Sequence, residues 1–276
     1  HENLQTCNIL HEIDLQSTRL RHINRGGVRD VFIYRNDLQS DEHVALKTLR
    51  FSKDFNFGKL EKHRLDALIS AKLDKEFVVD IFGYCAQSVL NEEIQGTLRS
   101  LDVSKLSGIE KLQVSYDAAS ALNHTHYGLS SIGEGSFVHR DITPKNFAVV
   151  QNKVKINDFN AARVLDNCDF IKKECNRFRS PEECGGKHLN EKLDVYSLGH
   201  IFFFLASGKL PYYQVKSETK ITDMILAHET PQINEGSNSR DAAYHVLVEA
   251  MHLCYQFSAD KRPNSHEIVT KLEDAL

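Results

Sequence analysis

The sequence lacks the features that mark fibrous, disordered and membrane-spanning chains. It contains only 5 Pro and no internal repeat or low-complexity tract, which argues against a fibrous or disordered protein. Its longest apolar run, Ile201–Ala206, is far shorter than the roughly 20 residues of a membrane-spanning helix. We therefore predict an ordinary soluble globular protein with no membrane contact within this segment.

An excess of positive charge is also absent. The sequence has 34 Lys and Arg against 38 Asp and Glu, a formal net charge of −4. It has no run of Lys and Arg that could follow a phosphate backbone. Nucleic acid is therefore not the expected partner, and the sequence leaves the oligomeric state open.

Cysteine pairs with a recognisable spacing are missing as well. The six cysteines include no CxxC pair and no Cys/His spacing typical of zinc sites, so we predict neither a disulfide framework nor structural zinc. This favours a reducing compartment, the cytoplasm. The chain begins at His1 without a signal-like segment, which is typical of an excised domain, such as the intracellular domain of a longer, membrane-anchored chain. The cysteines are Cys7, Cys85, Cys168, Cys175, Cys184 and Cys254.

The length of 276 residues favours two lobes around a cleft. Strand-like alternation fills the first third of the chain, and helical periodicity fills the rest. We predict an α+β fold in which residues 18–95 form a small β-rich lobe, residues 96–276 form a larger helical lobe, and residues 1–17 are a flank. The predicted strands are Val31–Arg35, His43–Leu49 and Val78–Cys85, and the predicted helices are Lys59–Leu73, Ile109–His126, Asp194–Gly208 (buried and central), Asp241–Gln256 and Ser265–Leu276.

Three short motifs carry the chemistry expected of such a cleft. VALK (Val44–Lys47) lies on a predicted strand, HRDITPKN (His139–Asn146) follows the first long helix of the second lobe, and DFN (Asp158–Asn160) comes a dozen residues later. Phosphoryl transfer from ATP needs a Lys for the nucleotide phosphates, two oxygen ligands for Mg²⁺ and a carboxylate that orients the attacking hydroxyl. In this order and at this spacing, the motifs resemble those of protein kinases.

The resemblance to protein kinases covers the chain from about residue 20 to the end. It implies a two-lobed kinase fold, ATP and Mg²⁺ as ligands, and a protein as the phosphoryl acceptor. It also implies that Lys47 holds the ATP phosphates, that Asp141 accepts the proton of the attacking hydroxyl, and that Asn146 and Asp158 hold Mg²⁺. The other nucleotide-binding positions that it implies are Gly26, Gly27, Val31, Ala45 and Asp66, with Leu90 or Asn91 at the back of the pocket.

Other segments resemble structural parts of the kinase fold. FRSPEE resembles the end of the activation segment, DVYSLG the start of the central helix, and ADKRP a later turn. The resemblance implies that Asp194 fastens the backbone of the catalytic loop and that Glu182 pairs with Arg262. We interpret these residues, with His139 and Arg140, as scaffold. The same segments favour the tyrosine-kinase-like branch of serine/threonine kinases.

The phosphate-covering loop departs from the family pattern Gly-x-Gly-x-x-Gly-x-Val. When the pattern is aligned on Val31, only Gly26 falls on a family glycine. The pair of Gly26 and Gly27 permits a tight turn whose backbone amides could face phosphate, and an ordinary hairpin tip is the alternative. Arg25 or Arg29 would add positive charge there.

Three further departures concern Asp66, Asn160 and Thr143. Asp66 stands where the family has a Glu that pairs with the strand Lys, so a pair with Lys47 needs the helix to lie nearer the cleft. Asn160 replaces a Gly, and Asn tolerates the positive φ expected of this bend. Thr143 replaces the Lys that neutralises the transferred phosphate, and Lys145 is the expected catalytic substitute.

The activation segment, residues 160–179, contains no Ser, Thr or Tyr. Kinases of this type often order it by phosphorylation, and the phosphate pairs with the Arg beside the catalytic Asp. We therefore expect Arg140 to pair with a fixed carboxylate, Asp169 or Glu174, or the segment to order without one. Cys175 is interpreted as a buried thiol, with a redox role as the alternative.

Two functions stay open on this evidence. The first is an ATP- and Mg²⁺-dependent protein kinase that modifies Ser or Thr more readily than Tyr, because no departure touches Lys47, Asp141, Asn146 or Asp158. The second is a pseudokinase acting as a binding or regulatory module, which the thinned glycine loop and Asp66 favour. A small-molecule phosphotransferase is disfavoured, because the SPEE segment belongs to the protein-substrate pattern.

Overall fold

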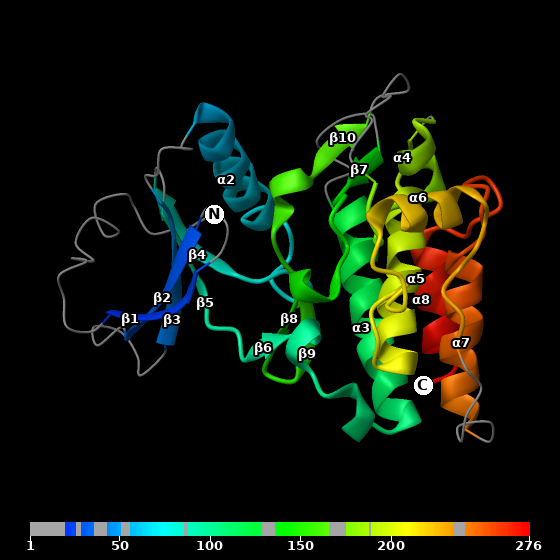
Figure 1. The fold of residues 1–276 in the computed structure, drawn as a ribbon. Helices are drawn as coiled ribbons and strands as arrows, with labels where there is room; N and C mark the ends of the chain where they lie inside the picture. Colours follow the sequence, from blue (N-terminus) through cyan, green and yellow to red (C-terminus); the bar gives the residue numbers. More distant parts are fainter. Residues whose placement is uncertain are drawn as a thin grey trace.

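The computed structural model of the protein has a sheet-rich N-terminal lobe and a helical C-terminal lobe, which confirms the predicted α+β fold of two lobes (Figure 1). It describes residues 20–25, 29–35, 43–50, 56–85, 88–128, 136–165, 175–187, 189–233 and 241–276. The glycine pair at 26 and 27 and the two carboxylates at 169 and 174 lie outside these residues.

The N-terminal lobe is built on an antiparallel sheet with the strand order β1-β2-β3-β5-β4. Alternation along β3 gives the sheet two faces. Val44 and Leu46 pack with Leu90 on one face, whereas Lys47 lies opposite Val89 on the other face, which carries the helix α2. The strands are β1 (Leu20–Arg25), β2 (Arg29–Arg35), β3 (His43–Leu49), β4 (Ile81–Cys85) and β5 (Ser88–Glu92).

The helix α2 (Phe57–Ser70) presents a carboxylate to the cleft from a buried face that mixes polar and apolar residues. It begins at Phe57 because the Asn56 side chain caps it by accepting from the Lys59 amide, and it ends three residues before the predicted boundary at Leu73. Asp66 lies on its buried face beside Ala67. The helix therefore aims a carboxylate at the junction between the lobes.

The C-terminal lobe surrounds the buried helix α5 (Lys192–Ser207). Every residue from Leu193 to Ala206 is buried, as expected for a central helix that is apolar on all sides. None of the helices within the described ranges is both long and apolar enough to cross a membrane. The other helices are α3 (Gly108–Tyr127), α4 (Pro181–Gly185), α6 (Glu218–Leu226), α7 (Ala242–Cys254) and α8 (Ser265–Glu273).

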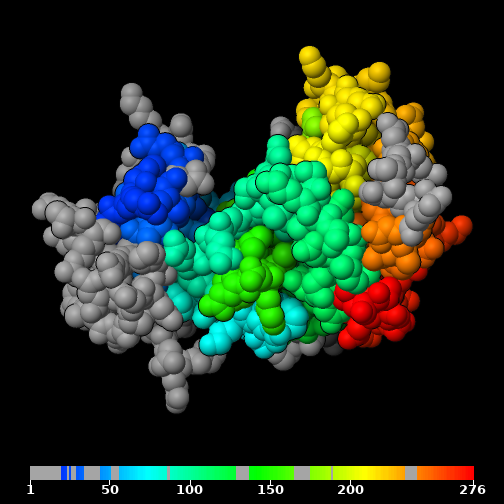
Figure 2. All heavy atoms as spheres, turned by 90° about the horizontal axis from the view of Figure 1, so that it is seen from below, coloured from blue at the N-terminus to red at the C-terminus, as the bar shows by residue number. Residues whose placement is uncertain are grey.

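The remaining short strands and 3-10 turns include those that carry the loops of the candidate site. The space-filling view shows the molecule hollowed between the N-terminal strands, in blue, and the helical lobe (Figure 2). These elements are β6 (Gly96–Thr97), β7 (Ser136–Val138), β8 (Phe147–Val150), β9 (Lys153–Ile156), β10 (Arg163–Leu165), η1 (Leu98–Ser100), η2 (Val103–Lys105), η4 (Pro144–Asn146) and η5 (Phe159–Ala161).

Candidate active site

The backbone of the catalytic loop is held by the buried carboxylate of Asp194 at the start of α5. Asp194 accepts hydrogen bonds from the amides of His139 (2.7 Å) and Arg140 (2.8 Å), and it lies 3.2 Å from Nε2 of His126. Burial raises the pKa of Asp194, but the hydrogen bonds from His126 and the loop outweigh burial and hold that pKa below its usual value. The expected role of Asp194 is confirmed. These bonds hold Arg140 at φ 63°, a strained conformation for a non-glycine residue.

Asp141 follows on this loop and is surrounded by donors. Its Oδ2 accepts from Nδ2 of Asn146 (2.8 Å) and lies 3.7 Å from Nζ of Lys145, and its Oδ1 accepts from Nη2 of Arg179 (3.3 Å). Burial raises the pKa of Asp141, but the charges of Lys145 and Arg179 outweigh it and hold that pKa below its usual value. The carboxylate is therefore anionic and partly open to solvent.

Arg179 is a site residue that the sequence reasoning missed. Its side chain is 5 % exposed, against 64 % for Lys145, and Nη1 donates to the carbonyl oxygen of Arg140. Because it is fixed on both sides, Arg179 supplies the positive charge beside Asp141 more rigidly than Lys145 does. No spacing rule brings residues 141 and 179 together, so only the fold could identify it.

The DFN turn differs from its expected geometry. The positive φ falls on Asp158 (68°), whereas Asn160 lies inside the turn η5. Asn160 is therefore not accommodated by a left-handed backbone. Its side chain makes contacts instead, with Nδ2 donating to Oδ1 of Asp158. Burial and the neighbouring charge of Asp66 raise the pKa of Asp158, against the opposite effects of Arg29 and Lys47.

The predicted pair between Lys47 and Asp66 is not formed. Nζ of Lys47 donates instead to Oδ1 of Asn157 (3.1 Å). Asp66 accepts from Nη1 of Arg29 (2.9 Å) and from the amide of Phe159 (2.7 Å). An aspartate is one methylene shorter than the glutamate of the family pattern, so the longer arginine reaches it from β2. Burial lowers the pKa of Lys47.

The back of the predicted nucleotide pocket is defined by strand register. Asn91 lies opposite Ala45 and on the same face of the sheet as Lys47, whereas Leu90 packs into the cluster on the other face. Of these two residues, Asn91 therefore lies on the face of the sheet that carries Lys47. Val31 lies opposite Lys47 on the neighbouring strand and belongs to the same face.

The donor atoms around this pocket suit both ATP and a divalent cation. Oδ1 of the buried Asn91 has no hydrogen-bond partner among the described residues, so a bound adenine amino group could satisfy it. Asp158, whose side chain is 34 % exposed, and the amide oxygen of Asn146 are the hard oxygen ligands that Mg²⁺ prefers. Over the described ranges, no group of three or more His, Cys, Asp or Glu could hold a metal by itself, so phosphate oxygens would have to complete the shell.

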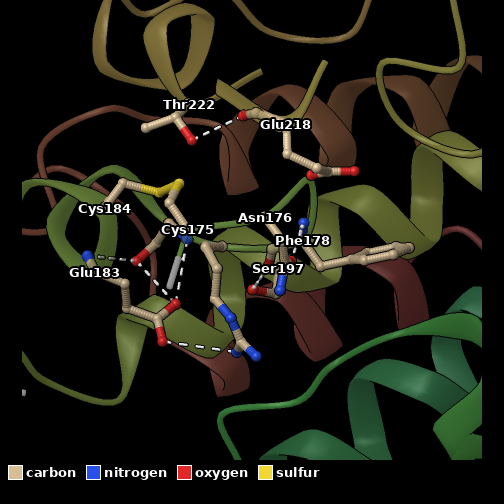
Figure 3. Close-up of a disulfide and its surroundings, with 10 residues drawn as sticks. Cys175, Asn176, Phe178, Glu183, Cys184, Ser197, Glu218 and Thr222 are labelled. Atoms are coloured by element: carbon tan, nitrogen blue, oxygen red, sulfur yellow. Dashed lines mark hydrogen bonds and ion pairs between the residues drawn. A yellow bond between two sulfur atoms is a disulfide. The ribbon is translucent and has the colours of Figure 1, made fainter. Parts of the chain in front are cut away.

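The end of the activation segment is tied to α4 by a disulfide between Cys175 and Cys184 (Figure 3). This corrects the predictions of a buried thiol at Cys175 and of a chain without disulfides, since Cys85 is disulfide-bonded as well. The two Cα atoms lie 4.9 Å apart and the residues are nine positions apart, a spacing that matches no common disulfide or metal motif. Ser197 also fixes the bridged stretch by donating to the carbonyl of Phe178 (2.6 Å).

A buried carboxylate that the sequence reasoning did not name, Glu183, lies near Arg140, whereas the predicted partners Asp169 and Glu174 lie outside the described residues. Oε1 of Glu183 lies 3.9 Å from Nε of Arg140 and 3.7 Å from Nη1 of Arg179. Burial raises the pKa of Glu183. The carboxylate therefore links the catalytic loop to α4 without a phosphorylated residue.

Loss of the Cys175–Cys184 bond is expected to destabilise the domain. A bridge that closes a loop of this length contributes about 2 to 3 kcal/mol by restricting the unfolded chain. The double variant Cys175→Ser/Cys184→Ser should therefore unfold at a lower urea concentration than the oxidised parent. The reduced parent and the reduced variant should unfold at the same urea concentration, because reduction removes the same bond from the parent. A difference between parent and variant that persists after reduction would contradict this account.

The arrangement between the two lobes defines a class of protein. A half-buried Lys on a strand, a carboxylate and a side-chain amide on one loop, and a second carboxylate on the next loop are typical of ATP-dependent phosphotransferases. Residues 17–272 match the family described as protein kinase domain. The chain therefore belongs to the protein kinase domain family.

Individual relatives include both serine/threonine kinases and a receptor. The serine/threonine-protein kinase PrkC of Bacillus subtilis is 28% identical over 77% of this chain and 33% of its own length. The serine/threonine-protein kinase STY46 of Arabidopsis thaliana is 26% identical over 95% of this chain and 45% of its own length. The insulin-like growth factor 1 receptor of Xenopus laevis is 27% identical over 86% of this chain and 18% of its own length. The chain thus spans less than half the length of each of these relatives.

Proposed function

We propose that the domain transfers the γ-phosphoryl group of ATP to serine or threonine hydroxyls of proteins. The observation that carries the proposal is the anionic, partly exposed carboxylate of Asp141, held by Asn146 and Arg179 at the mouth of the cleft. Asp141 accepts the proton of the attacking hydroxyl while the oxygen of that hydroxyl forms a bond to the γ-phosphorus. The bond from that phosphorus to the β–γ bridging oxygen breaks, and ADP leaves.

The remaining site residues have proposed roles in binding and charge stabilisation. Lys47 would hold the nucleotide phosphates, and Lys145 would face the transferred group. Asp158 and the amide oxygen of Asn146 would hold a divalent cation, which we propose is Mg²⁺. When bound, the cation would neutralise charge on the phosphate oxygens. Arg179 supplies fixed positive charge near Asp141, where Thr143 replaces the Lys of the family pattern.

The remaining nucleotide-binding assignments are also proposals. Val31, Ala45 and Asn91 would contact the adenine and ribose from one face of the sheet. The glycine pair before β2 would cover the phosphates. Asp66, through Arg29 and not through Lys47, would keep α2 in place.

The proposed partner is a protein substrate and not a nucleic acid. Two relatives that are named serine/threonine-protein kinases support Ser/Thr specificity. The cytoplasm is the proposed location, and the receptor among the relatives supports the alternative of an intracellular domain in a longer, membrane-anchored chain. Disulfides are rare in reducing compartments, so the domain should be assayed with Cys175 and Cys184 both bonded and reduced.

A transfer assay with γ-labelled ATP tests this function. In the presence of Mg²⁺, the purified domain is expected to label itself or a generic protein acceptor, and acid hydrolysis should release labelled phosphoserine or phosphothreonine. Excess EDTA should abolish the transfer, because Asp158 and Asn146 would lose the cation. Tight ATP binding without labelling of any acceptor would contradict the proposal and favour a pseudokinase that binds or regulates a partner.

A further inference from the structure

Arg29 is the only cation in the described part of the cleft that contacts both α2 and the DFN turn. Its Nη1 donates to Oδ2 of Asp66 (2.9 Å) and lies 3.9 Å from Oδ1 of Asp158. Its Nη2 donates to Oδ1 of Asn160. One guanidinium therefore joins β2, α2 and η5, three elements that meet only in the folded chain.

The strand β2 directs Arg29 into the cleft. Arg29 and Val31 lie on the same face of the strand, since side chains alternate, and Val31 lies opposite Lys47 on β3. Arg29 is thus a diagonal neighbour of Lys47 on the face that borders the cleft. When the glycine-loop pattern is aligned on Val31, Arg29 occupies the position of the third family glycine, which covers the nucleotide phosphates.

Three departures from the kinase pattern contact one another here. Arg29 replaces a glycine of the phosphate loop, Asp66 replaces the glutamate of α2, and Asn160 replaces the glycine of the DFG-type triplet. Asp66 and Asn160 both accept from the guanidinium of Arg29. Independent losses in an inactive site would have no reason to fit together, so we read the three residues as one arrangement.

The cluster is formally neutral but, within the described ranges, keeps one unused hydrogen-bond donor. Arg29 and Lys47 face Asp66 and Asp158, and Asp66 is already held by Arg29 and by the amide of Phe159. Nε of Arg29 is buried and has no hydrogen-bond partner among the described residues. The side chain is 12 % exposed, so the guanidinium is fixed before any ligand binds. A planar, pre-positioned donor of this kind suits phosphate oxygens.

Arg25 does not share these properties. Its side chain is 66 % exposed and pairs with Asp30 on the outer side of the hairpin (3.1 Å). Of the two arginines that flank the glycine pair, only Arg29 points to the cleft.

We propose that Arg29 is a phosphate-binding residue of the nucleotide site, anchored by Asp66 and Asn160 and acting beside Lys47. The inference deepens the proposed kinase function and rests on it in taking ATP as the ligand. Asp66 serves the nucleotide through Arg29, and the helix α2 is tied to β2 in place of β3.

Binding of ATP and of adenosine separates a phosphate contact from a general structural role. Dissociation constants for both ligands are measured by calorimetry or by competition with a fluorescent nucleotide, in EDTA and in Mg²⁺. The variants are Arg29→Gln, Arg29→Lys and the matched control Arg21→Gln, which removes the same charge from an exposed position on β1. The ratio of the two constants is insensitive to the folded fraction of each sample.

Arg29→Gln is expected to weaken ATP binding at least tenfold and adenosine binding less than twofold, because a charge-assisted hydrogen bond to phosphate is lost. Arg29→Lys should retain part of the preference for ATP over adenosine. Lys keeps the positive charge but lacks the planar guanidinium that binds both Asp66 and Asn160. Arg21→Gln should bind ATP and adenosine with the same dissociation constants as the parent. Unchanged or tighter ATP binding by Arg29→Gln would overturn the proposal, and so would an equal loss for both ligands.

The two proposals can fail separately. If Arg29→Gln loses its ATP preference but the parent transfers no label, Arg29 binds phosphate in a pseudokinase. If the parent transfers label and Arg29→Gln binds ATP as the parent does, the domain is a kinase in which Arg29 only holds α2.

Discussion

Replacement of Asp141 by Asn is expected to lower the rate of phosphoryl transfer about a thousandfold, the middle of the range for losing a general base. Asparagine keeps the size and the contact with Asn146 but cannot accept the proton of the hydroxyl. The ATP dissociation constant should stay within about twofold of the parent, because Asp141 faces the acceptor side and contacts only Asn146 and Lys145 among the residues proposed to hold ATP or the cation. Single-turnover transfer and ATP binding are measured separately.

Asp102→Asn is the matched control for this experiment. Asp102 is an exposed residue that caps η2 in the helical lobe, and asparagine caps as well as aspartate does. This control should transfer label at the parent rate. Transfer by Asp141→Asn at a rate near that of the control would exclude Asp141 as the base, and a parallel loss of ATP binding would show damage to the whole site.

Replacement of Arg262 by Met is expected to destabilise the domain by about 3 to 5 kcal/mol, the cost of breaking a buried ion pair on one side. Arg262 is buried and bonds Glu182 through both terminal nitrogens, at 2.6 and 3.2 Å. It also donates to the carbonyl oxygens of Lys192, Gln256 and Phe257. The variant leaves a buried carboxylate and several carbonyls without this partner. Urea unfolding measures the change.

Lys271→Met provides the comparison with an exposed pair. Nζ of Lys271 lies 2.8 Å from Oε2 of Glu249 at the surface, and exposed pairs contribute little. Its free energy of unfolding should stay close to that of the parent. The double variant Arg262→Met/Glu182→Gln should lose less than the sum of its single changes, because the buried charge is gone. An Arg262→Met variant as stable as Lys271→Met would contradict the assigned role of this pair.

Much of the fold was predictable because its signals are local. The alternation along β3 gave the strand His43–Leu49 to the residue, and the apolar run after Asp194 gave the buried central helix α5. Fixed motif order also predicted two long-range contacts through the kinase resemblance. Asp194 does hold the catalytic-loop amides, and Arg262 does pair with Glu182.

Contacts in the candidate site could be predicted only between residues that belong to the same short sequence motif. Asp141, Lys145 and Asn146 lie on one short loop, so their proximity follows from chain connectivity. The partner of Asp66 does not follow from connectivity, and the expected choice of Lys47 was wrong. Two cations compete for that carboxylate, and the shorter aspartate and the longer arginine decide between them only once the helix and the strands are in place.

The sequence by itself determined the protein kinase fold and the order of its motifs, because periodicity and motif spacing act over short stretches of chain, whereas the backbone of the DFN turn differed from the expected one. The tertiary structure alone decided that Arg29 holds Asp66 and Asn160, that Arg179 reaches Asp141, and that Cys175 bonds Cys184. These contacts depend on distances of a few ångströms between side chains from separate elements. Packing of the folded chain sets such distances, so they cannot be predicted from composition or from the spacing of motifs in the sequence.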